Sequence, residues 1–253
     1  MTAPAYRQVA AELRAAIERG DYPEGSVLPK LEEIAQQYGI AKQTAREAIG
    51  ELENEGLVEP VRRRGTVVRP APNRQHLVRA RQVFRDERGY YFDPTAQPWI
   101  ALEQPTISFG AAPRHIAPLL AVHPGDDVLI RDRLIGHPDT RQPTQLATSY
   151  LPATLARGTR LAEADTGPGG IYDLLEQMGH GPLQWSESIS AAMPTPREAE
   201  RLTLPRGVPL LRITRTTTSP AGTVLEVNDT RMSAEAFEIG YTLTRHPNAT
   251  PAT

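Results

Sequence analysis

Apolar residues repeat at helical spacing in three segments near the start of the chain. The first segment, residues 5–19, has the apolar positions Val9, Leu13, Ala16 and Ile17. The second, residues 31–38, has Leu31, Ile34, Ala35 and Tyr38 and is followed by Gly39. The third, which starts near Lys42, has Ala45, Ala48, Ile49 and Leu52. These spacings predict three amphipathic helices, with a short turn between the last two.

Two short runs rich in β-forming residues follow the third helix. They cover residues 57–61 and 66–69, and a basic turn with Arg62, Arg63 and Arg64 precedes Gly65. Such runs around a glycine-containing turn predict a β-hairpin. Because Gly65 has no side chain, it permits close approach to another molecule. The whole pattern is typical of a helix-turn-helix followed by a hairpin wing.

The third helix exposes polar side chains near its N-terminal end, opposite its apolar side. In a helix-turn-helix this part of the second helix enters the DNA major groove and touches base edges. Lysine and arginine suit guanine, and glutamine can pair with adenine. The candidate base-contacting residues are Lys42, Gln43, Thr44 and Arg46.

Residues 6–69 resemble the winged helix-turn-helix of GntR-type transcription regulators. The resemblance is carried by Tyr6, Ile17, Gly20, Gly25, Leu28-Pro29, Ile34-Ala35, Gly39, Thr44, Arg46, Leu52, Glu55-Gly56-Leu57 and Gly65-Thr66. It implies double-stranded DNA as a partner and adds Thr66 to the candidate DNA-binding residues. Glu32 stands where the family often has a DNA-contacting arginine. Either Lys30 substitutes for that arginine, or the backbone contact there is lost.

From Tyr90 onward the pattern changes to strands, short helices and loops, and it contains an internal repeat. A shift of 82 residues superimposes Ala117 on Ala199, Leu120 on Leu202, Gly125 on Gly207, Val128 on Leu210, Leu129 on Leu211 and Arg133 on Arg215. Each copy predicts a short helix, a glycine turn, a strand, a loop and a second strand. Two such hairpins, with the strand of residues 184–193 between them, would build one antiparallel sheet.

Residues 90–244 resemble the UTRA effector domain of the HutC branch of these regulators, and match best a group of actinomycete members that includes regulators of plasmid transfer. The resemblance is carried by residues 125–131 (GDDVLIR), 147–152 (ATSYLP), 167–172 (GPGGIY) and 193–196 (MPTP). It implies an α+β fold in which the winged helix-turn-helix is followed by an antiparallel-sheet, chorismate-lyase-like domain. It also implies a homodimer and a small-molecule effector.

The expected organisation therefore has four parts. Residues 1–69 form the DNA-binding domain, 70–89 a proline-stiffened linker with an arginine-rich segment, 90–244 the effector-binding and dimerisation domain, and 245–253 a disordered tail. The arginine-rich stretch at 76–88 is expected to be a solvated helix with a small apolar face. Alternatively, its arginines add phosphate contacts beside the wing.

Two arginines of the second domain are the first candidates for effector binding. Arg131 and Arg133 are two residues apart on a predicted strand and so share a face. The UTRA resemblance implies that Tyr150 converges with them on a pocket and that Glu226 lies on its rim. Guanidinium groups favour a ligand with a carboxylate or phosphate, hence an acidic effector. A glutamate that some family members have near Ala147 is absent, which argues against a sugar. The alternative is that the arginines only pair with surface acids.

Two further features of this domain are candidates for the effector site. Thr166, Gly169 and Gly170 precede a predicted helix over 171–178, where free backbone amides could bind an anion. A tight turn that only feeds the helix explains them equally. Glu187 interrupts an otherwise apolar strand face, so it either has a partner, lines a cavity, or is exposed near the strand end.

Composition excludes several classes of protein. The formal charge is −2, but residues 62–88 carry nine arginines against Asp86 and Glu87, so positive charge is concentrated there. The absence of cysteine excludes disulfides and thiolate metal sites. The histidines show no metal-binding spacing, no catalytic motif is present, and no cofactor is expected. No apolar run is long enough to span a membrane, so a cytoplasmic protein without membrane contact is expected.

The sequence thus predicts a transcription regulator, specifically a ligand-responsive repressor that binds a near-palindromic operator as a homodimer. One alternative is an enzyme of chorismate-lyase type with an appended winged helix, for which Glu187 would be the general acid or base. Another is a regulator whose C-terminal domain only dimerises.

Overall fold

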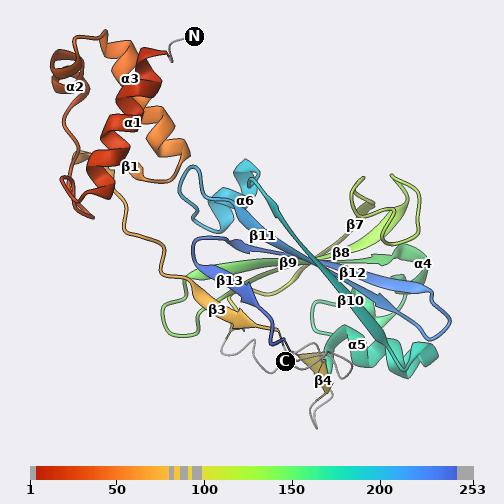
Figure 1. Cartoon of the computed structure of the whole chain (residues 1–253). Coiled ribbons are helices and arrows are strands. Elements are labelled where there is room, and N and C mark those ends of the chain that lie inside the picture. The colour runs from red at the N-terminus through yellow and green to blue at the C-terminus, as the bar shows by residue number, and fades with distance from the viewer. Residues whose placement is uncertain (1–3, 80–82, 86–90, 93–98, 244–253) are drawn as a thin grey trace, which may run out of the picture. The chain divides into compact units, whose positions relative to one another are not determined.

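The computed structural model describes residues 4–79, 83–85, 91–92 and 99–243, which Figure 1 shows in colour. The chain forms two compact units. The first contains residues 1–73 together with 193–209, and the second contains residues 74–192 together with 210–253. The tail expected over 245–253 lies outside the described residues.

The first unit contains the predicted helix-turn-helix and hairpin. Its elements are α1 (Ala5–Glu18), α2 (Leu31–Tyr38), α3 (Lys42–Asn54), β1 (Val58–Val61), β2 (Gly65–Val68) and α6 (Pro196–Arg201). α2 ends where predicted because Gly39 adopts a left-handed conformation with φ of 62°. α3 begins three residues later, so the turn between the two helices is as short as the sequence indicates.

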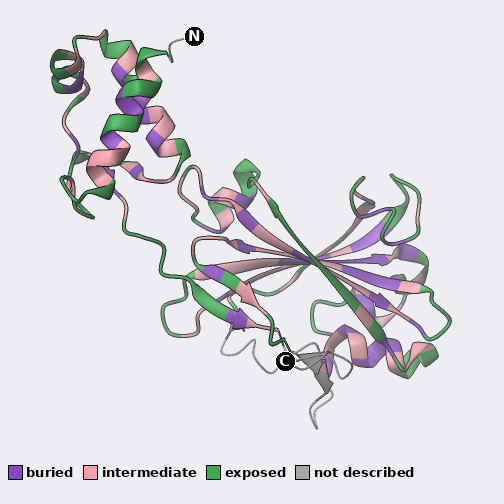
Figure 2. Cartoon of the chain, viewed as in Figure 1, coloured by how far each residue is buried: buried purple, intermediate pink, exposed green. Residues whose placement is uncertain are grey.

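The apolar sides of the three helices meet in one core. Its deeply buried members include Leu13, Ile34, Ala45, Ala48 and Leu52, each no more than 2% exposed. Figure 2 shows this burial along the facing sides of the helices. The hairpin is tied to the same core by Val58 and Val68, and a bridge between Val27 and Val67 holds β2 against the segment before α2.

The second unit is built around an antiparallel sheet of seven strands. Its members are β6 (Ile100–Ala101), β7 (Thr106–Ala111), β8 (Asp127–Gly136), β9 (Pro143–Pro152), β10 (Gln184–Ala192), β11 (Leu210–Thr218) and β12 (Val224–Ser233). The order is β10-β11-β12-β9-β8-β6, and β7 also pairs with β8. The fold class is therefore the predicted one, a winged helix-turn-helix followed by an α+β domain with an antiparallel sheet.

The internal repeat corresponds to two hairpins, β8–β9 and β11–β12. They join through antiparallel pairing of β9 with β12, so the repeated strands form the centre of the sheet. β10 lies between the hairpins in the sequence but at the edge of the sheet in space, beyond β11. The helix expected at the start of the first copy is a series of turns over residues 114–122, whereas α6 in the second copy has the capping box between Thr195 and Glu198.

Helical segments cover part of one sheet face. They are α4 (Ala153–Ala156), η1 (Arg160–Ala162), α5 (Gly170–Leu175) and the π-type turn η2 (Glu176–His180). Leu161, Leu174 and Leu175 pack there against Leu129 and Leu151 of the sheet. The helix expected over 171–178 is therefore divided after Leu175. On the opposite sheet face, Ile116 and Leu120 from the turn region pack against Val128 and Val227.

The expected helix over residues 76–88 is wrong in the part that the structure describes. Residues Gln75–Val78 form β3, which pairs in parallel with β13 (Phe237–Gly240). Leu77 and Phe237 then join a small core with Ile213 and Met232. Two further short strands, β4 (Phe84–Arg85) and β5 (Tyr91–Phe92), pair with each other. The backbone of this segment therefore finds its hydrogen bonds in a distant part of the sequence, which local spacing could not indicate.

Among the described residues, no helix has the length and apolar character that crossing a membrane requires.

Replacing Leu52 by alanine should destabilise the first unit. Leu52 is fully buried in the helical core, and truncation of such a leucine costs about 2–5 kcal/mol. Thermal or urea unfolding followed by circular dichroism would measure the loss. Leu243→Ala is the control, because Leu243 is 82% exposed and its truncation should change little. Equal stability of the two variants would contradict this description of the core.

Candidate functional site

The exposed start of α3 presents the predicted base-contacting side chains. Lys42, Gln43 and Arg46 are exposed, and Thr44 is half-buried. The neighbouring Ala45 faces the helical core. The rigid packing of α3 therefore leaves a short row of hydrogen-bonding groups directed away from the domain.

These side chains are already linked to one another and to α2. Arg46 Nη1 donates to Gln43 Oε1 at 3.3 Å, and Gln43 Nε2 donates to Glu47 Oε1 at 3.3 Å. Lys42 forms an ion pair with Glu32, and its hydrogen bond to that carboxylate lowers the pKa of Glu32. Glu32, the acid at the position where the family often has an arginine, therefore binds Lys42, the first residue of α3.

The turn of the hairpin carries exposed positive charge. Arg62, Arg63 and Arg64 are all exposed, and Arg64 Nη2 donates to the carbonyl oxygen of Gly25 at 2.5 Å. Arg63 has a φ of 65° and Gly65 a φ of 109°, so the turn needs two left-handed residues in three positions. A side chain at Gly65 would also approach Val27 Cγ1 to 3.2 Å. The glycine is therefore required by the turn itself.

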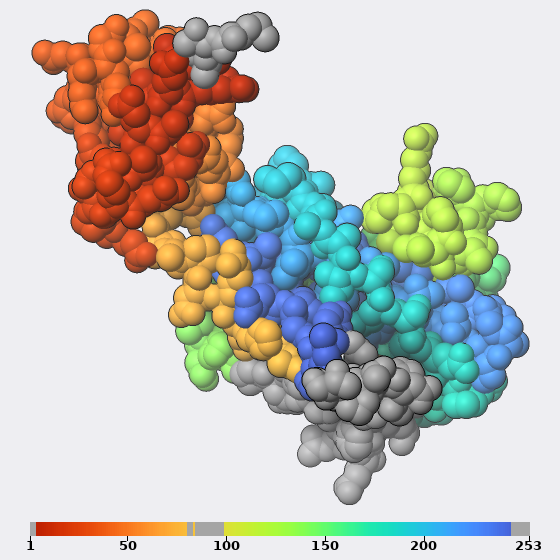
Figure 3. All heavy atoms as spheres, in the orientation of Figure 1, coloured from red at the N-terminus to blue at the C-terminus, as the bar shows by residue number. Residues whose placement is uncertain are grey.

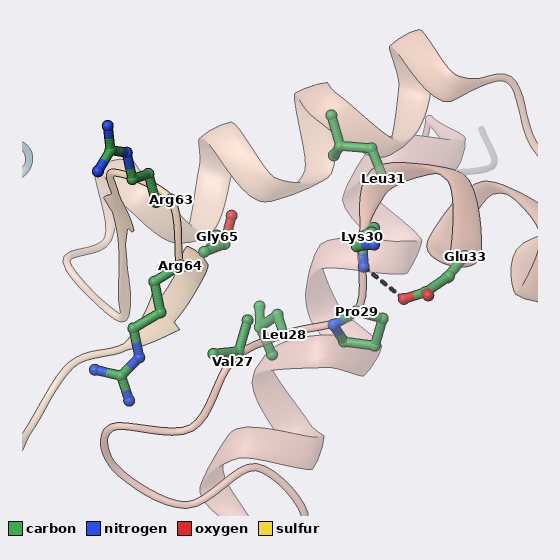
Figure 4. Close-up of a pocket in the computed structure, with 10 residues that line it drawn as sticks. Val27, Leu28, Pro29, Lys30, Leu31, Glu33, Arg63, Arg64 and Gly65 are labelled. Atoms are coloured by element: carbon green, nitrogen blue, oxygen red, sulfur yellow. Dashed lines mark hydrogen bonds between the residues drawn. The ribbon is translucent and has the colours of Figure 1, made fainter.

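A groove of about 570 Å³ lies between this turn and the start of α2. It is lined by Val27, Leu28, Pro29, Lys30, Leu31, Glu33, Arg63, Arg64, Gly65 and Thr66. Figure 4 shows the wing arginines on one side of the groove and the start of α2 on the other. The carboxylate of Glu33 accepts a hydrogen bond from the Lys30 amide at 2.8 Å. An anion in the groove would therefore meet side-chain cations rather than that amide.

In the second unit, polar side chains form a row across one face of the sheet. The cross-strand register aligns Arg131 of β8 with Ser149 of β9, Asn228 of β12, Arg215 of β11 and Glu187 of β10. Directly opposite residues of an antiparallel pair lie on the same face. The row thus crosses five strands, and we refer to these five residues, together with Arg133 and Glu226 on the same sheet face, as the polar row.

Arg131 and Arg133 stand at one end of the polar row without a carboxylate partner in the described part of the chain. Arg131 donates to the carbonyl oxygens of Glu163 and Ala164, both at 2.6 Å. Arg133 Nη2 donates to Ser149 Oγ at 3.0 Å, and its buried Nε has no partner among the described residues. Burial, with the nearby charge of Arg133, lowers the pKa of Arg131 to about 10. The charge of the exposed Asp165 carboxylate opposes this lowering, but these contacts include no ion pair with a surface acid among the described residues.

Glu226 is buried rather than at the rim of a pocket. It is 1% exposed, and its Oε2 accepts a hydrogen bond from Thr217 Oγ1 at 2.8 Å. Its Oε1 is buried and has no partner among the described residues. Burial raises the pKa of the Tyr172 phenol, and the neighbouring Glu226 carboxylate raises it further. Buried polar atoms in proteins are usually hydrogen-bonded, so the free Oε1 favours a bound molecule that donates a hydrogen bond to it.

Glu187 has partners from two elements. Arg215 Nε donates to Glu187 Oε1 at 2.8 Å, and Arg79, which follows β3, binds the same carboxylate. Burial opposes ionisation of Glu187, but the hydrogen bond from Arg79 and the charge of Arg215 outweigh it and lower its pKa. Glu187 therefore has partners and is at the same time exposed, so two of the three expectations for this residue describe it.

Tyr150 does not converge with the two arginines. It pairs with Ile130 in the register, so it lies on the sheet face opposite Arg131. There it packs in the core with Ile116 and Leu120. The expected contact is wrong because Tyr150 follows Ser149 directly, and successive residues of a strand point to opposite faces.

The loop with Thr166, Gly169 and Gly170 lies beside Arg131, whose donors bind the carbonyls of residues 163 and 164. Gly169 and Gly170 have φ values of 83° and 67°. The Gly170 amide donates to Gly167 O at 3.2 Å, and the Thr166 carbonyl accepts from Arg160. These contacts agree with the alternative of a tight turn, since the turn conformation alone accounts for the glycines.

The sequence analysis missed several members of this site. Arg215 and Thr217 of β11 and Arg79 were not among the candidates, and Ser149 and Asn228 were not assigned a role. The internal repeat held a usable signal for Arg215, because it superimposes on Arg133. Arg79 gave no such signal, since its contact with Glu187 spans 108 residues of sequence. No cluster of residues suited to a metal ion occurs in the parts of the chain that the structure describes.

Family comparisons match most of the chain in two segments. Residues 5–68 match the family described as bacterial regulatory proteins, gntR family, and residues 102–238 match the UTRA domain. The first segment contains α3 and the wing, and the second contains the polar row. Each candidate site therefore lies within one matched domain.

Individual relatives match this chain over most of their length. An uncharacterised HTH-type transcriptional regulator of Streptomyces coelicolor is 33% identical over 88% of this chain and 87% of its own. The HTH-type transcriptional repressor NagR of Bacillus subtilis is 27% identical over 88% of each chain. The crystal structure of a GntR-family transcriptional regulator superimposes with a TM-score of 0.64 and 26% identity, over 96% of this chain and 98% of that one. The protein is a DNA-binding transcription regulator of the GntR family with a UTRA domain.

Proposed function

We propose that this protein is a ligand-responsive repressor that binds a near-palindromic operator as a homodimer. The observation that carries the proposal is the pair Arg131 and Arg133, partly buried without a carboxylate partner in the described residues, in the domain that follows the winged helix. A regulator whose second domain only dimerises would gain nothing from such a pair, because neighbouring buried cations that form no ion pair are costly.

The first unit supports operator recognition in two ways. α3 directs Lys42, Gln43 and Arg46 outward, where they can reach base edges in the major groove. The exposed wing arginines and Lys30 surround the groove beside α2, where side-chain cations suit the phosphate backbone. Base contacts would supply specificity, and the wing would supply affinity that depends on salt.

The polar row supports an effector with two kinds of group. An anionic group, carboxylate or phosphate, would meet the donors of Arg131 and Arg133. A hydrogen-bond donor on the same molecule would satisfy the unpaired oxygen of Glu226. The Bacillus subtilis relative is a repressor, and release of DNA on ligand binding is the response that we propose here. It requires the effector to favour a dimer conformation whose half-site spacing does not fit the operator.

The alternative of a chorismate-lyase-like enzyme has little support in the site. Its only candidate for a general acid or base was Glu187, and two arginines hold that carboxylate in its charged form. A residue engaged in this way is poorly suited to exchange protons near neutral pH. The family assignment points the same way.

A gel-shift titration with DNA from upstream of the protein's own gene tests the proposal directly. Specific binding should survive an excess of random competitor DNA at physiological salt. Equal binding to the upstream DNA and to random DNA would contradict the proposal of a sequence-specific repressor.

Replacing Arg46 by alanine should weaken operator binding and relax its specificity. A side chain that contacts a base contributes about 1–3 kcal/mol of discrimination. Fluorescence anisotropy on the operator and on random DNA would give both affinities. The comparison variant is Arg62→Gln with Arg63→Gln, which should lower both affinities alike and flatten the salt dependence by about two units of slope. An equal loss on both DNAs for Arg46→Ala would mean that Arg46 contacts only phosphate.

Replacing Glu32 by glutamine should strengthen DNA binding. The change removes a negative charge and frees Lys42 from its ion pair, so one more cation can reach the backbone. We expect the slope of log affinity against log salt to become steeper by about one unit. Glu12→Gln on α1 makes the same charge change elsewhere and serves as the control. An unchanged slope for Glu32→Gln, matching the control, would show that Lys42 does not contact the phosphate backbone.

Replacing Arg131 by alanine should leave operator binding intact but abolish the response to the effector. Loss of a charged hydrogen-bonding partner costs about 1.5–3 kcal/mol, which corresponds to a ten- to hundred-fold higher ligand concentration. Thermal-shift screening of acidic metabolites would first identify a ligand, and DNA release would then be titrated.

The design of that experiment needs a second variant, because Arg131 also anchors the loop at residues 163–164. Arg133→Gln tests the same anion-binding role without that anchor. Arg157→Ala, which removes an exposed partner of Asp127, is the control. If both row variants release DNA at the wild-type ligand concentration, the effector site is elsewhere.

A further inference from the structure

β10 is an edge strand with one side open. It pairs with β11 along its full length of nine residues, and no other described strand pairs with it. Most of its residues are exposed, as Figure 2 shows, and the teal segment that contains it reaches the surface in the space-filling view of Figure 3. Within the described part of the chain, its outer backbone groups are therefore open to another strand.

The strand has none of the usual devices that prevent pairing at an edge. Its register with β11 has no bulge, and its sequence, QWSESISAA, contains neither proline nor lysine. The single charged residue, Glu187, is neutralised by Arg79 and Arg215. An edge of this kind is a template for a further strand.

The sequence of β10 is complementary to itself about Ile189. An antiparallel pairing of two copies centred on that residue places Ile189 opposite Ile189 of the second copy. The same register places Ser188 opposite Ser190 and Glu187 opposite Ala191 of that copy. No like charges therefore lie opposite each other. The register instead forms an isoleucine pair and serine pairs, which stabilise antiparallel sheets.

An apolar groove continues this edge on the face of Ile189. It has a volume of about 490 Å³ and is lined by Arg74, Ile189, Leu211, Ala234, Phe237, Glu238, Ile239 and Tyr241. Ile189 and Tyr241 are 36% and 43% exposed, which is high for large apolar side chains. The groove therefore extends the surface that a second copy would cover.

We propose that β10 is the dimerisation edge of this protein, where it pairs antiparallel with β10 of a second copy across a two-fold axis at Ile189. The inference rests on the proposed homodimer and specifies its interface. Nine residues span only about 30 Å of strand, whereas a stable interface buries about 800 Å² on each partner. The adjoining groove supplies the additional apolar area, and the two sheets become one continuous sheet through the dimer.

Cysteine cross-linking tests the register, because the natural chain contains no cysteine. Ile189→Cys places two thiols directly opposite each other, within reach of a disulfide. Mild oxidation should link most of that variant into a covalent dimer that binds the operator. Ser188→Cys, one residue away, is the matched control. Its two thiols lie diagonally at about 7–8 Å between Cα atoms, so it should link at least about ten-fold more slowly.

A charge variant tests the interface without cross-linking. Ile189→Lys brings two like charges face to face at the axis, so the dimer dissociation constant in analytical ultracentrifugation should rise at least about ten-fold. Ile189 is partly exposed, and an unchanged melting profile of the dilute protein would confirm that the fold survives.

The outcomes separate this inference from the proposed function. If the natural protein is a dimer but neither variant behaves as described, the dimer uses another surface and the inference is wrong. A natural protein that sediments as a monomer also overturns it. The first result leaves the proposed homodimer intact, whereas the second also contradicts the homodimer of the proposed function. Operator binding itself is measured independently by the gel-shift titration.

Discussion

The antiparallel pairing of β9 with β12 is the constraint on which the second unit depends. It joins two sequence-related hairpins into one sheet, and its register decides which side chains share a face. Ser149 meets Asn228 in this pairing, and the flanking ladders then bring Arg131, Arg215 and Glu187 into the same line. A slip of one residue would turn every one of these side chains to the opposite face. The polar row therefore exists only in this register.

Placing a polar row in a sheet face is costly unless its members satisfy one another. At one end this is achieved, because Glu187 lies between Arg79 and Arg215. In the middle, Ser149 accepts hydrogen bonds from both Arg133 and Asn228. At the other end the balance is incomplete, since Arg131 and Arg133 find only uncharged oxygens and Glu226 retains an unpaired one. Fold stability alone does not require this arrangement, and binding of a charged ligand would complete it.

Local spacing was sufficient to predict the winged helix-turn-helix of the first unit but only part of the second unit, and it did not predict that residues 193–209 belong to the first unit. Helix boundaries followed from apolar periodicity and from Gly39, and the central hairpins followed from a repeat that preserves the positions of Arg133 and Arg215. Pairing between distant segments was not predictable. β3 was expected to be helical, and the strand was missed because its partner β13 lies about 160 residues away in the sequence. The expected role of Tyr150 was wrong because it ignored the alternation of strand faces. The wing arginines were predicted from composition, whereas the ion pair of Lys42 with Glu32 required the packing of two helices.

The polar row is also connected to the segment through which the chain enters the second unit. β3 is fixed by its backbone pairing with β13, and Arg79, the next residue, binds Glu187. The Glu187 carboxylate forms ion pairs with both Arg79 and Arg215, and Arg215 is a member of the row. An anion that attracts Arg215 would leave more of that carboxylate to Arg79, and one that excludes it would do the opposite. A ligand can shift a conformational equilibrium only through groups that differ between two states. Among the described residues, this shared carboxylate links the row to the stretch that leads from the winged helix, so it is where such a difference can arise.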